Sequence, residues 1–194
     1  MKELVDEQIW EAFIAGDDKA LAYIYNTYAN KLYNYGKQFT KKEEMVQDAI
    51  QDVFCELIQS RKKLAKTTSV KFYLFACIRN RVMHALRKED KYLHIHIESK
   101  EAGFQVELLS ENSFFRKFFN QETKTILENT FNNLPIRQRE AIMLYFYEDM
   151  SYQEIADIMQ IGKVKSARAL VYRALESLSK NLHEMKYHSI EAVL

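Results

Sequence analysis

The scarcity of residues that interrupt helices is the strongest constraint on this chain. It contains one proline and four glycines among 194 residues, whereas folds rich in β-strands use more of both residues in their turns. Apolar residues also recur at intervals of three or four along most of the chain, which is typical of amphipathic helices. We therefore predict an all-α protein, and 47% hydrophobic content over this length suits either one large or two small domains.

The stretch 151–180 predicts two helices joined by a tight turn. Ser151 and Glu154 have the spacing of a capping box at a helix start, and Gly162 follows a short apolar face. The second helix has an apolar stripe on one side (Val164, Ala167, Val171, Ala174 and Leu178) and a basic, polar surface on the other (Lys165, Ser166, Arg168, Tyr172 and Arg173). This pattern is typical of a helix-turn-helix, whose second helix enters the DNA major groove.

An ordinary helical hairpin remains an alternative for this stretch, since it would also have a capped helix and a solvated basic face. Five Lys or Arg against one Glu between residues 163 and 180 favour a phosphate-bearing partner. The commonest helix-turn-helix places its glycine nearer to position 160, where this chain has Gln160. The turn length and the register of the second helix therefore stay open.

A further helix is expected before this stretch. Pro135 would occupy its first position, and it would end near residue 149. Its core residues would be Ala141, Ile142, Leu144, Tyr145 and Phe146.

Four helices are predicted in the first 91 residues: 3–15, 18–39, 41–60 and 69–88, with Thr40 and Glu43 as a second capping box. A basic, polar loop at 61–69 separates the last two. The helix 18–39 is expected to bury a face formed by Leu21, Ile24, Tyr25, Tyr28, Leu32 and Tyr35. The helix 41–60 buries a stripe formed by Val46, Ala49, Ile50, Val53 and Leu57. Its outward face would carry Asp48, Gln51, Asp52 and Glu56, and without further information such a face is an ordinary solvated surface.

The run from Asp48 to Phe54, DAIQDVF, resembles the D-x-x-Q-D/E-x-F signature of bacterial sigma factors of the extracytoplasmic-function (ECF) type, which belong to the sigma-70 family. The resemblance continues in LAYIYNTYANKLYNYGKQF, SVKFYLFACIRNRVMHALRKED and LPIRQREAIMLYFYEDMSYQEIADIM, in the family's order. It implies sigma domain 2 at 1–91, a flexible linker at 92–121, sigma domain 4 with the helix-turn-helix at 122–182, and a C-terminal tail at 183–194.

By this resemblance the chain is expected to be a cytoplasmic transcription initiation factor, not an enzyme, that binds core RNA polymerase and directs it to promoters without a cofactor. The polymerase-binding residues would be Asp48, Gln51, Asp52 and Glu56, with Phe54 in support. The minus-10 element would meet Lys66, Ser69, Asn80, His84 and Arg87. The minus-35 element would meet Lys165, Ser166, Arg168, Tyr172 and Arg173, with Arg137 and Arg139 on phosphates.

The resemblance also implies a helical anti-sigma factor as a partner, and it has two departures from the family pattern. Tyr73 stands where the family usually has tryptophan, which keeps an aromatic packing role. His84 stands where an acidic residue is common, so the base preference at the minus-10 element stays open.

Other sites receive less support from the sequence. Cys55 and Cys77 are isolated and are predicted to be reduced core thiols. His94 and His96 lack partners at metal-ligand spacing, so no metal site is expected. No apolar run has the length of a membrane span, so no membrane insertion is expected.

Two other function classes are alternatives to the sigma-factor interpretation. A conventional regulator would bind a palindromic site as a dimer through the same helix-turn-helix. An enzyme acting on a small-molecule substrate is disfavoured, because no nucleotide-binding loop or nucleophile motif is visible. The carboxylates at Asp48 and Asp52 are also expected to lack His or basic partners for general acid–base catalysis.

Overall fold

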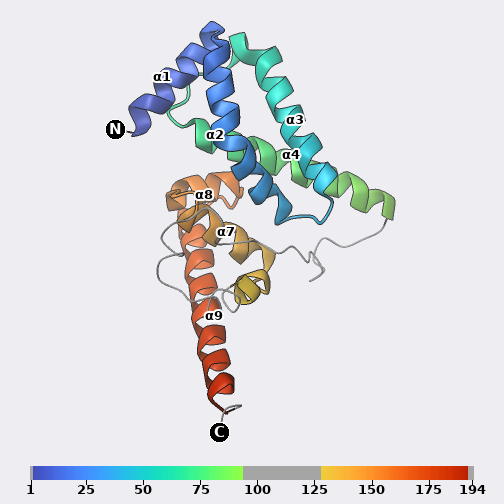
Figure 1. The fold of residues 1–194 in the computed structure, drawn as a ribbon, viewed down its shortest axis with the longest axis vertical. Helices are drawn as coiled ribbons and strands as arrows, with labels where there is room; N and C mark the ends of the chain where they lie inside the picture. Colours follow the sequence, from blue (N-terminus) through green and yellow to red (C-terminus); the bar gives the residue numbers. More distant parts are fainter. Residues whose placement is uncertain (1, 94–127, 192–194) are drawn as a thin grey trace. The chain divides into compact units, whose positions relative to one another are not determined.

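The computed structural model describes residues 2–93 and 128–191. The chain divides into two compact units, residues 1–99 and 100–194 (Figure 1). Within the described ranges every regular element is a helix and no strand occurs, which confirms the predicted all-α class. Apart from residues 92 and 93, the predicted linker at 92–121 lies outside the described residues.

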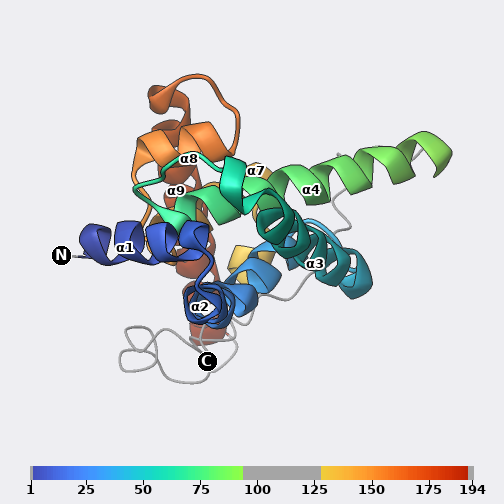
Figure 2. The same ribbon diagram turned by 90° about the horizontal axis from the view of Figure 1, so that it is seen from above.

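In its described residues, 2–93, the first unit contains four α-helices and one short 3-10 helix. Figure 2 shows the arrangement of these α-helices. In chain order these are α1 (Lys2–Ala15), α2 (Asp18–Lys37), α3 (Glu43–Ser60), η1 (Arg61–Lys63) and α4 (Val70–Leu93). Helices α2, α3 and α4 pack against one another, while α1 packs on α2, η1 and α4. The loop predicted at 61–69 therefore begins with one turn of 3-10 helix.

The core of this unit is formed by the apolar stripes of its helices. The predicted stripe of α3 is buried at all five positions, as the sequence analysis expected. The largest fully buried side chains are aromatic or branched aliphatic: Trp10, Phe13, Ile24, Leu32, Tyr35, Leu74, Phe75 and Ile78. Burying these faces stabilises the unit and leaves the opposite faces of the helices in solvent.

Three predictions for the first unit are wrong. Thr40 and Glu43 form no capping box, because α3 begins at Glu43 and its N-cap residue is Lys42. Thr40 Oγ1 instead accepts a hydrogen bond from the Lys42 N–H at 3.1 Å, and Glu43 pairs with Lys37 at 2.7 Å. Tyr25, predicted on the buried face of α2, is 50% exposed. Cys55 is exposed as well, so it is not a core thiol.

The second unit contains a helical turn at 128–132 followed by α7 (Ile136–Phe146), α8 (Tyr152–Ile158) and α9 (Val164–Glu191). Its core includes Phe131, Leu134, Ile142, Met143 and Ala174. Figure 1 shows α9 running far beyond the other helices of its unit. The predicted tail from residue 183 is therefore helical as far as Glu191, because the backbone of α9 continues through it.

Two details of α7 also differ from the prediction. Pro135 is the N-cap residue of α7 and precedes its first turn by one position. Phe146, which was expected in the core, is 45% exposed at the end of α7. In the part of the chain that the structure describes, no helix is apolar over a sufficient length to span a lipid bilayer.

We predict that Gly36→Ala destabilises the first unit. A Cβ atom at position 36 would lie 2.5 Å from Val46 Cγ1, between α2 and α3. The overpacking should lower the free energy of unfolding by about 1–3 kcal/mol and outweigh the better helix propensity of alanine, which contributes roughly 1 kcal/mol. Urea unfolding measures the change.

The control for this prediction is the double variant Gly36→Ala, Val46→Ala, in which the clashing methyl group is absent. Its free energy of unfolding should exceed the value expected from adding the two single changes. If the effects of the two single changes on the free energy of unfolding simply add, the contact with Val46 is not what disfavours a larger residue at position 36.

Candidate nucleic-acid and protein interfaces

Helix α3 presents one polar face to solvent. Asp48, Gln51, Asp52 and Glu56 are all exposed, as their spacing predicted. Phe54 lies on the other side of the helix, where it is 5% exposed and meets the ring of Tyr25 with centroids 4.9 Å apart. The four polar residues thus share one accessible surface, which we call the α3 surface, and Phe54 supports it from below.

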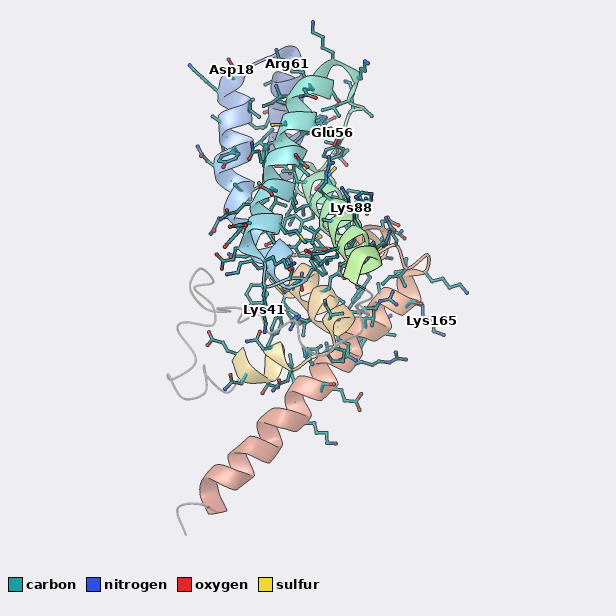
Figure 3. All side chains as sticks on the ribbon, turned by 90° about the vertical axis from the view of Figure 1, so that its right-hand side faces the viewer. Asp18, Lys41, Glu56, Arg61, Lys88 and Lys165 are labelled. Atoms are coloured by element: carbon teal, nitrogen blue, oxygen red, sulfur yellow. The ribbon has the colours of Figure 1, made fainter. Side chains whose placement is uncertain are left out.

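Arg81 on α4 adds a positive charge to the edge of the α3 surface. Its guanidinium lies 3.8 Å from Asp52 Oδ2 and also donates a hydrogen bond to Glu56 Oε2. Figure 3 labels Glu56 on α3 beside α4. The expectation that Asp52 lacks a basic partner is therefore wrong. Contacts between helices have no signature in residue spacing, which explains why the sequence did not reveal this one.

The side chains of this ion pair remain open to solvent. The exposed fractions are 37% for Arg81, 61% for Asp52 and 67% for Glu56. Exposed pairs of this kind contribute on the order of 0–1 kcal/mol to stability. The carboxylates therefore stay available to a competing cationic partner.

The segment between η1 and α4 is held by α1. Trp10, which is 1% exposed, donates its Nε1–H to the carbonyl oxygen of Ala65 at 3.0 Å. Lys66 Nζ lies 2.8 Å from Glu11 Oε1, and this hydrogen bond raises the pKa of Lys66. The buried Trp10 donor therefore anchors the backbone of residues 64–69, while the exposed Lys66–Glu11 pair adds little.

Ser69 has a structural role at the start of α4. Its Oγ accepts a hydrogen bond from the N–H of Phe72 at 3.1 Å, while its own N–H donates to Thr67 Oγ1 at 3.2 Å. The side chain is half-buried. Ser69 therefore shapes the loop and the helix start, and its hydroxyl is engaged within the chain.

Helix α4 exposes Asn80, His84 and Arg87, which follow one another at helical spacing. Its opposite face is buried through Val70, Leu74, Phe75, Ile78 and Val82. These three exposed residues, with the loop 64–69, form the candidate nucleic-acid surface of the first unit. Arginine and asparagine are suited to this role, because their side chains bind phosphates or base edges.

Tyr73 keeps the aromatic packing role that the sequence predicted. Its ring centroid lies 5.2 Å from that of Trp10, and burial raises the pKa of its phenol to about 12. Cys77, one turn later, is hydrogen-bonded to Tyr73, and burial raises the pKa of its thiol. Trp10 therefore links α4 and the preceding loop through a single buried side chain.

The second unit contains the predicted helix-turn-helix. The Ser151 N–H donates to Glu154 Oε2 at 2.8 Å and the Glu154 N–H donates to Ser151 Oγ at 3.3 Å, which confirms the capping box. Helix α9 begins at Val164 after a turn in which both Gln160 and Gly162 have positive φ angles, of 54° and 72°. The structure thus gives the turn length and the register that the sequence left open.

The outward side of α9 carries the predicted polar residues. Lys165, Arg168, Tyr172 and Arg173 are exposed, whereas Ser166 is half-buried. Lys165 projects near the start of α9 (Figure 3). The inward side is held by Ala167, Val171 and Ala174, which are all buried. Val164, expected on the apolar stripe, is 39% exposed because it is the first residue of the helix.

Arg139 does not fit its expected role at a DNA phosphate. The side chain is 3% exposed, and its Nη1 donates to the carbonyl oxygen of Asn132 at 3.0 Å. Burial lowers the pKa of its guanidinium. The residue braces the connection between the helical turn 128–132 and α7, whereas Arg137 is exposed in the first turn of α7.

Comparison with protein families identifies both units. Residues 24–92 match the model for sigma-70 region 2, and residues 124–178 match the model for sigma-70, region 4. The two matches together cover more than half of the chain, in the order that the sequence analysis expected. The chain belongs to the sigma-70 family. Members of this family are transcription initiation factors.

Several relatives of this sigma-70 family member are named as ECF sigma factors. The ECF RNA polymerase sigma factor SigM of Bacillus subtilis is 26% identical, over 80% of this chain and 90% of its own length. The ECF RNA polymerase sigma-E factor of Haemophilus influenzae is 22% identical, over 95% of this chain and 98% of its own length. The resemblance to ECF sigma factors is therefore confirmed over nearly the whole chain.

Solved structures agree in fold. CnrH, in complex with the cytosolic domain of CnrY, has a TM-score of 0.61 and 18% identity over 92% of this chain and 97% of its own. The sigma factor RpoE of Bartonella quintana, in complex with the anti-sigma factor NepR, has a TM-score of 0.59 and 20% identity over 86% of this chain and 96% of its own. At these identities the likeness concerns the fold.

We predict that Trp10→Phe loosens the loop 64–69. Phenylalanine keeps most of the buried ring but leaves the Ala65 carbonyl without its donor, which should cost about 1–2 kcal/mol in the free energy of unfolding. Limited trypsin digestion should then cut faster after Lys62, Lys63 and Lys66.

The control is Glu11→Gln, which weakens only the exposed ion pair with Lys66 and should leave the cleavage rate nearly unchanged. Equal cleavage rates in Trp10→Phe and the unchanged protein would show that the indole hydrogen bond does not hold the loop.

Proposed function

We propose that this chain binds core RNA polymerase and directs it to promoters that carry minus-10 and minus-35 elements. The observation that carries the proposal is the pair of family matches in the order region 2, region 4, on two helical units with separate polar surfaces. In this proposal, residues 1–91 act as sigma domain 2 and residues 122–182 as sigma domain 4. Its place of action is the cytoplasm, where polymerase meets promoter DNA.

The α3 surface is the proposed polymerase-binding site. It is acidic, exposed and presented by a helix whose opposite face is anchored in the core. These properties suit docking on the coiled coil of the largest polymerase subunit. Arg81 would exchange its pairing with Asp52 and Glu56 for contacts with that partner, and the weakness of exposed ion pairs makes the exchange inexpensive.

The exposed residues of α4 and the loop before it are the proposed reader of the minus-10 element. Asn80, His84 and Arg87 would contact bases and phosphates as the duplex opens, with Lys66 at the edge of the site. Lys66 is paired with Glu11 and 80% exposed, so it is accessible to a phosphate. Ser69 contributes by shaping the loop, since its hydroxyl already accepts the Phe72 N–H.

Helix α9 is the proposed reader of the minus-35 element. Its outward residues Lys165, Ser166, Arg168 and Tyr172 would enter the major groove, with Arg173 and Arg137 on phosphates. Arg139 takes no part in this surface, because its guanidinium is buried. Two modest DNA contacts joined through one polymerase raise each other's effective concentration, so neither needs a large basic area.

An anti-sigma factor is also proposed as a partner. The support is fold likeness to CnrH and to RpoE, each of which was solved in a complex, the second with an anti-sigma factor. Such a partner would regulate the chain by covering a surface that polymerase needs.

We predict that an Asp48→Ala, Asp52→Arg double variant loses binding to core polymerase. The change removes one negative charge and reverses another at the centre of the α3 surface, while both residues are exposed, so the fold should be unaffected. Co-elution of purified chain and bacterial core polymerase on a sizing column measures binding, and affinity should fall at least about tenfold.

The matched control for docking is Glu44→Ala, which removes an exposed carboxylate from the first turn of the same helix. It should co-elute as the unchanged chain does. If the unchanged chain fails to bind polymerase and runs as a dimer that binds palindromic DNA, the conventional regulator is the correct interpretation.

We predict that Asn80→Ala reduces promoter opening without weakening the binding of polymerase. An asparagine makes paired hydrogen bonds to a base edge, and its loss should lower open-complex formation about five- to one-hundredfold. Permanganate footprinting of unpaired thymines measures opening, and Asn26→Ala on α2 serves as the control at another exposed asparagine. Unchanged opening in Asn80→Ala would remove this residue from the DNA site.

A further inference from the structure

An aromatic cluster surrounds one arginine of the helix-turn-helix. Tyr145 at the end of α7 stacks on Tyr152 at the start of α8, with ring centroids 4.9 Å apart and an interplanar angle of 11°. The Arg168 guanidinium carbon lies 5.9 Å from the centroid of Tyr152 and 5.4 Å from that of Tyr172. All three helices of the helix-turn-helix unit therefore contribute to the surroundings of Arg168.

Hydrogen bonds reinforce this cluster. Arg168 Nη2 donates to the Tyr172 hydroxyl at 3.4 Å, and this contact raises the pKa of Arg168. A hydrogen bond with Tyr145 is the main cause of the raised pKa of Tyr152. Tyr152 is thus held by Tyr145 and lies within cation–π distance of Arg168, although Arg168 itself is exposed.

The restriction of Arg168 matters because of how arginine reads DNA. A guanidinium reads a guanine through two parallel hydrogen bonds, which require one orientation of its planar fork. An exposed arginine normally populates many rotamers, and ordering it on binding costs conformational entropy. The rings of Tyr152 and Tyr172 and the Tyr172 hydroxyl restrict the Arg168 side chain before DNA binds. This restriction reduces the entropy cost of binding.

We propose that Tyr152 and Tyr172 are positioning residues that hold Arg168 ready to read a base pair, with Tyr145 acting through Tyr152. This inference rests on the proposed function, because it assumes that α9 reads the minus-35 element. It adds that Arg168 determines which base pair is preferred at one position of the minus-35 element. Lys165, a point charge without a planar fork, contributes affinity with little base discrimination.

The test uses the full chain in complex with core polymerase and a promoter library randomised over the upstream element. Arg168→Ala should abolish the preference at one or two neighbouring base pairs. Tyr152→Ala should reduce the preference at those same base pairs about two- to fivefold, which corresponds to losing one exposed cation–π contact. Tyr152→Phe keeps the ring and should retain most of the preference.

Phe146→Ala is the matched control. Phe146 contacts the ring of Tyr145 with centroids 4.9 Å apart and is 45% exposed, so it joins the cluster through Tyr145. Its removal should leave the preference intact. Circular dichroism and thermal unfolding of each variant confirm that the helices are present.

The outcomes separate this inference from the proposed function. If Arg168→Ala abolishes the preference but Tyr152→Ala leaves it unchanged, the positioning role is overturned and the proposed function stands. An equal loss at every base pair in Tyr152→Ala, or a loss in Phe146→Ala that matches it, also overturns positioning, since both indicate general loosening. If no variant, including Arg168→Ala, changes any preference while polymerase still binds, Arg168 is not a reader.

Discussion

The structure depends on each helix burying one continuous apolar face. Helix α3 illustrates the constraint, because its buried stripe and its acidic surface are two sides of the same cylinder. With 3.6 residues per turn, placing Val46, Ile50 and Val53 in the core leaves no choice about where Asp48 and Asp52 point. The surface proposed for polymerase is thus held rigid by packing beneath it, with Phe54 and Tyr25 in contact below.

Helix α1 connects other parts of the first unit. Its Trp10 is buried against the ring of Tyr73 and reaches the backbone of Ala65, so one side chain joins the first helix, the loop and α4. A loop with lysines at 62, 63 and 66 would otherwise be free to sample many conformations. Anchoring it by a buried donor orders the backbone while the charged side chains remain accessible to nucleic acid.

The second unit combines a buried and an exposed arginine with different tasks. Arg139 contributes to structure, since its guanidinium meets the Asn132 carbonyl inside the unit. Arg168 lies at the surface near two tyrosine rings, where its guanidinium stays accessible to the proposed DNA partner. Both residues belong to the same amphipathic unit, and their environments, not their residue type, separate the two roles.

The sequence by itself determined the helical class, the order of the two regions and the exposed polar faces. These follow from local periodicity and from short signatures such as DAIQDVF, which do not require knowledge of distant contacts. The Ser151 capping box was also readable, because both of its partners lie within one helical turn. The start of α3 was predicted two residues too early, and there Glu43 pairs with Lys37 while Thr40 accepts the Lys42 N–H.

Only the tertiary structure decided which charges meet across helices. The pairing of Arg81 with the α3 surface, the contact of Arg139 with Asn132 and the Tyr152 ring near Arg168 all join residues from different elements. Residue spacing carries information along one helix, whereas these contacts depend on how helices pack. Tyr25 and Phe146 were expected in the core, but both are exposed. Periodicity predicts which face of a helix is apolar, whereas the packing of neighbouring helices decides how much of that face is buried.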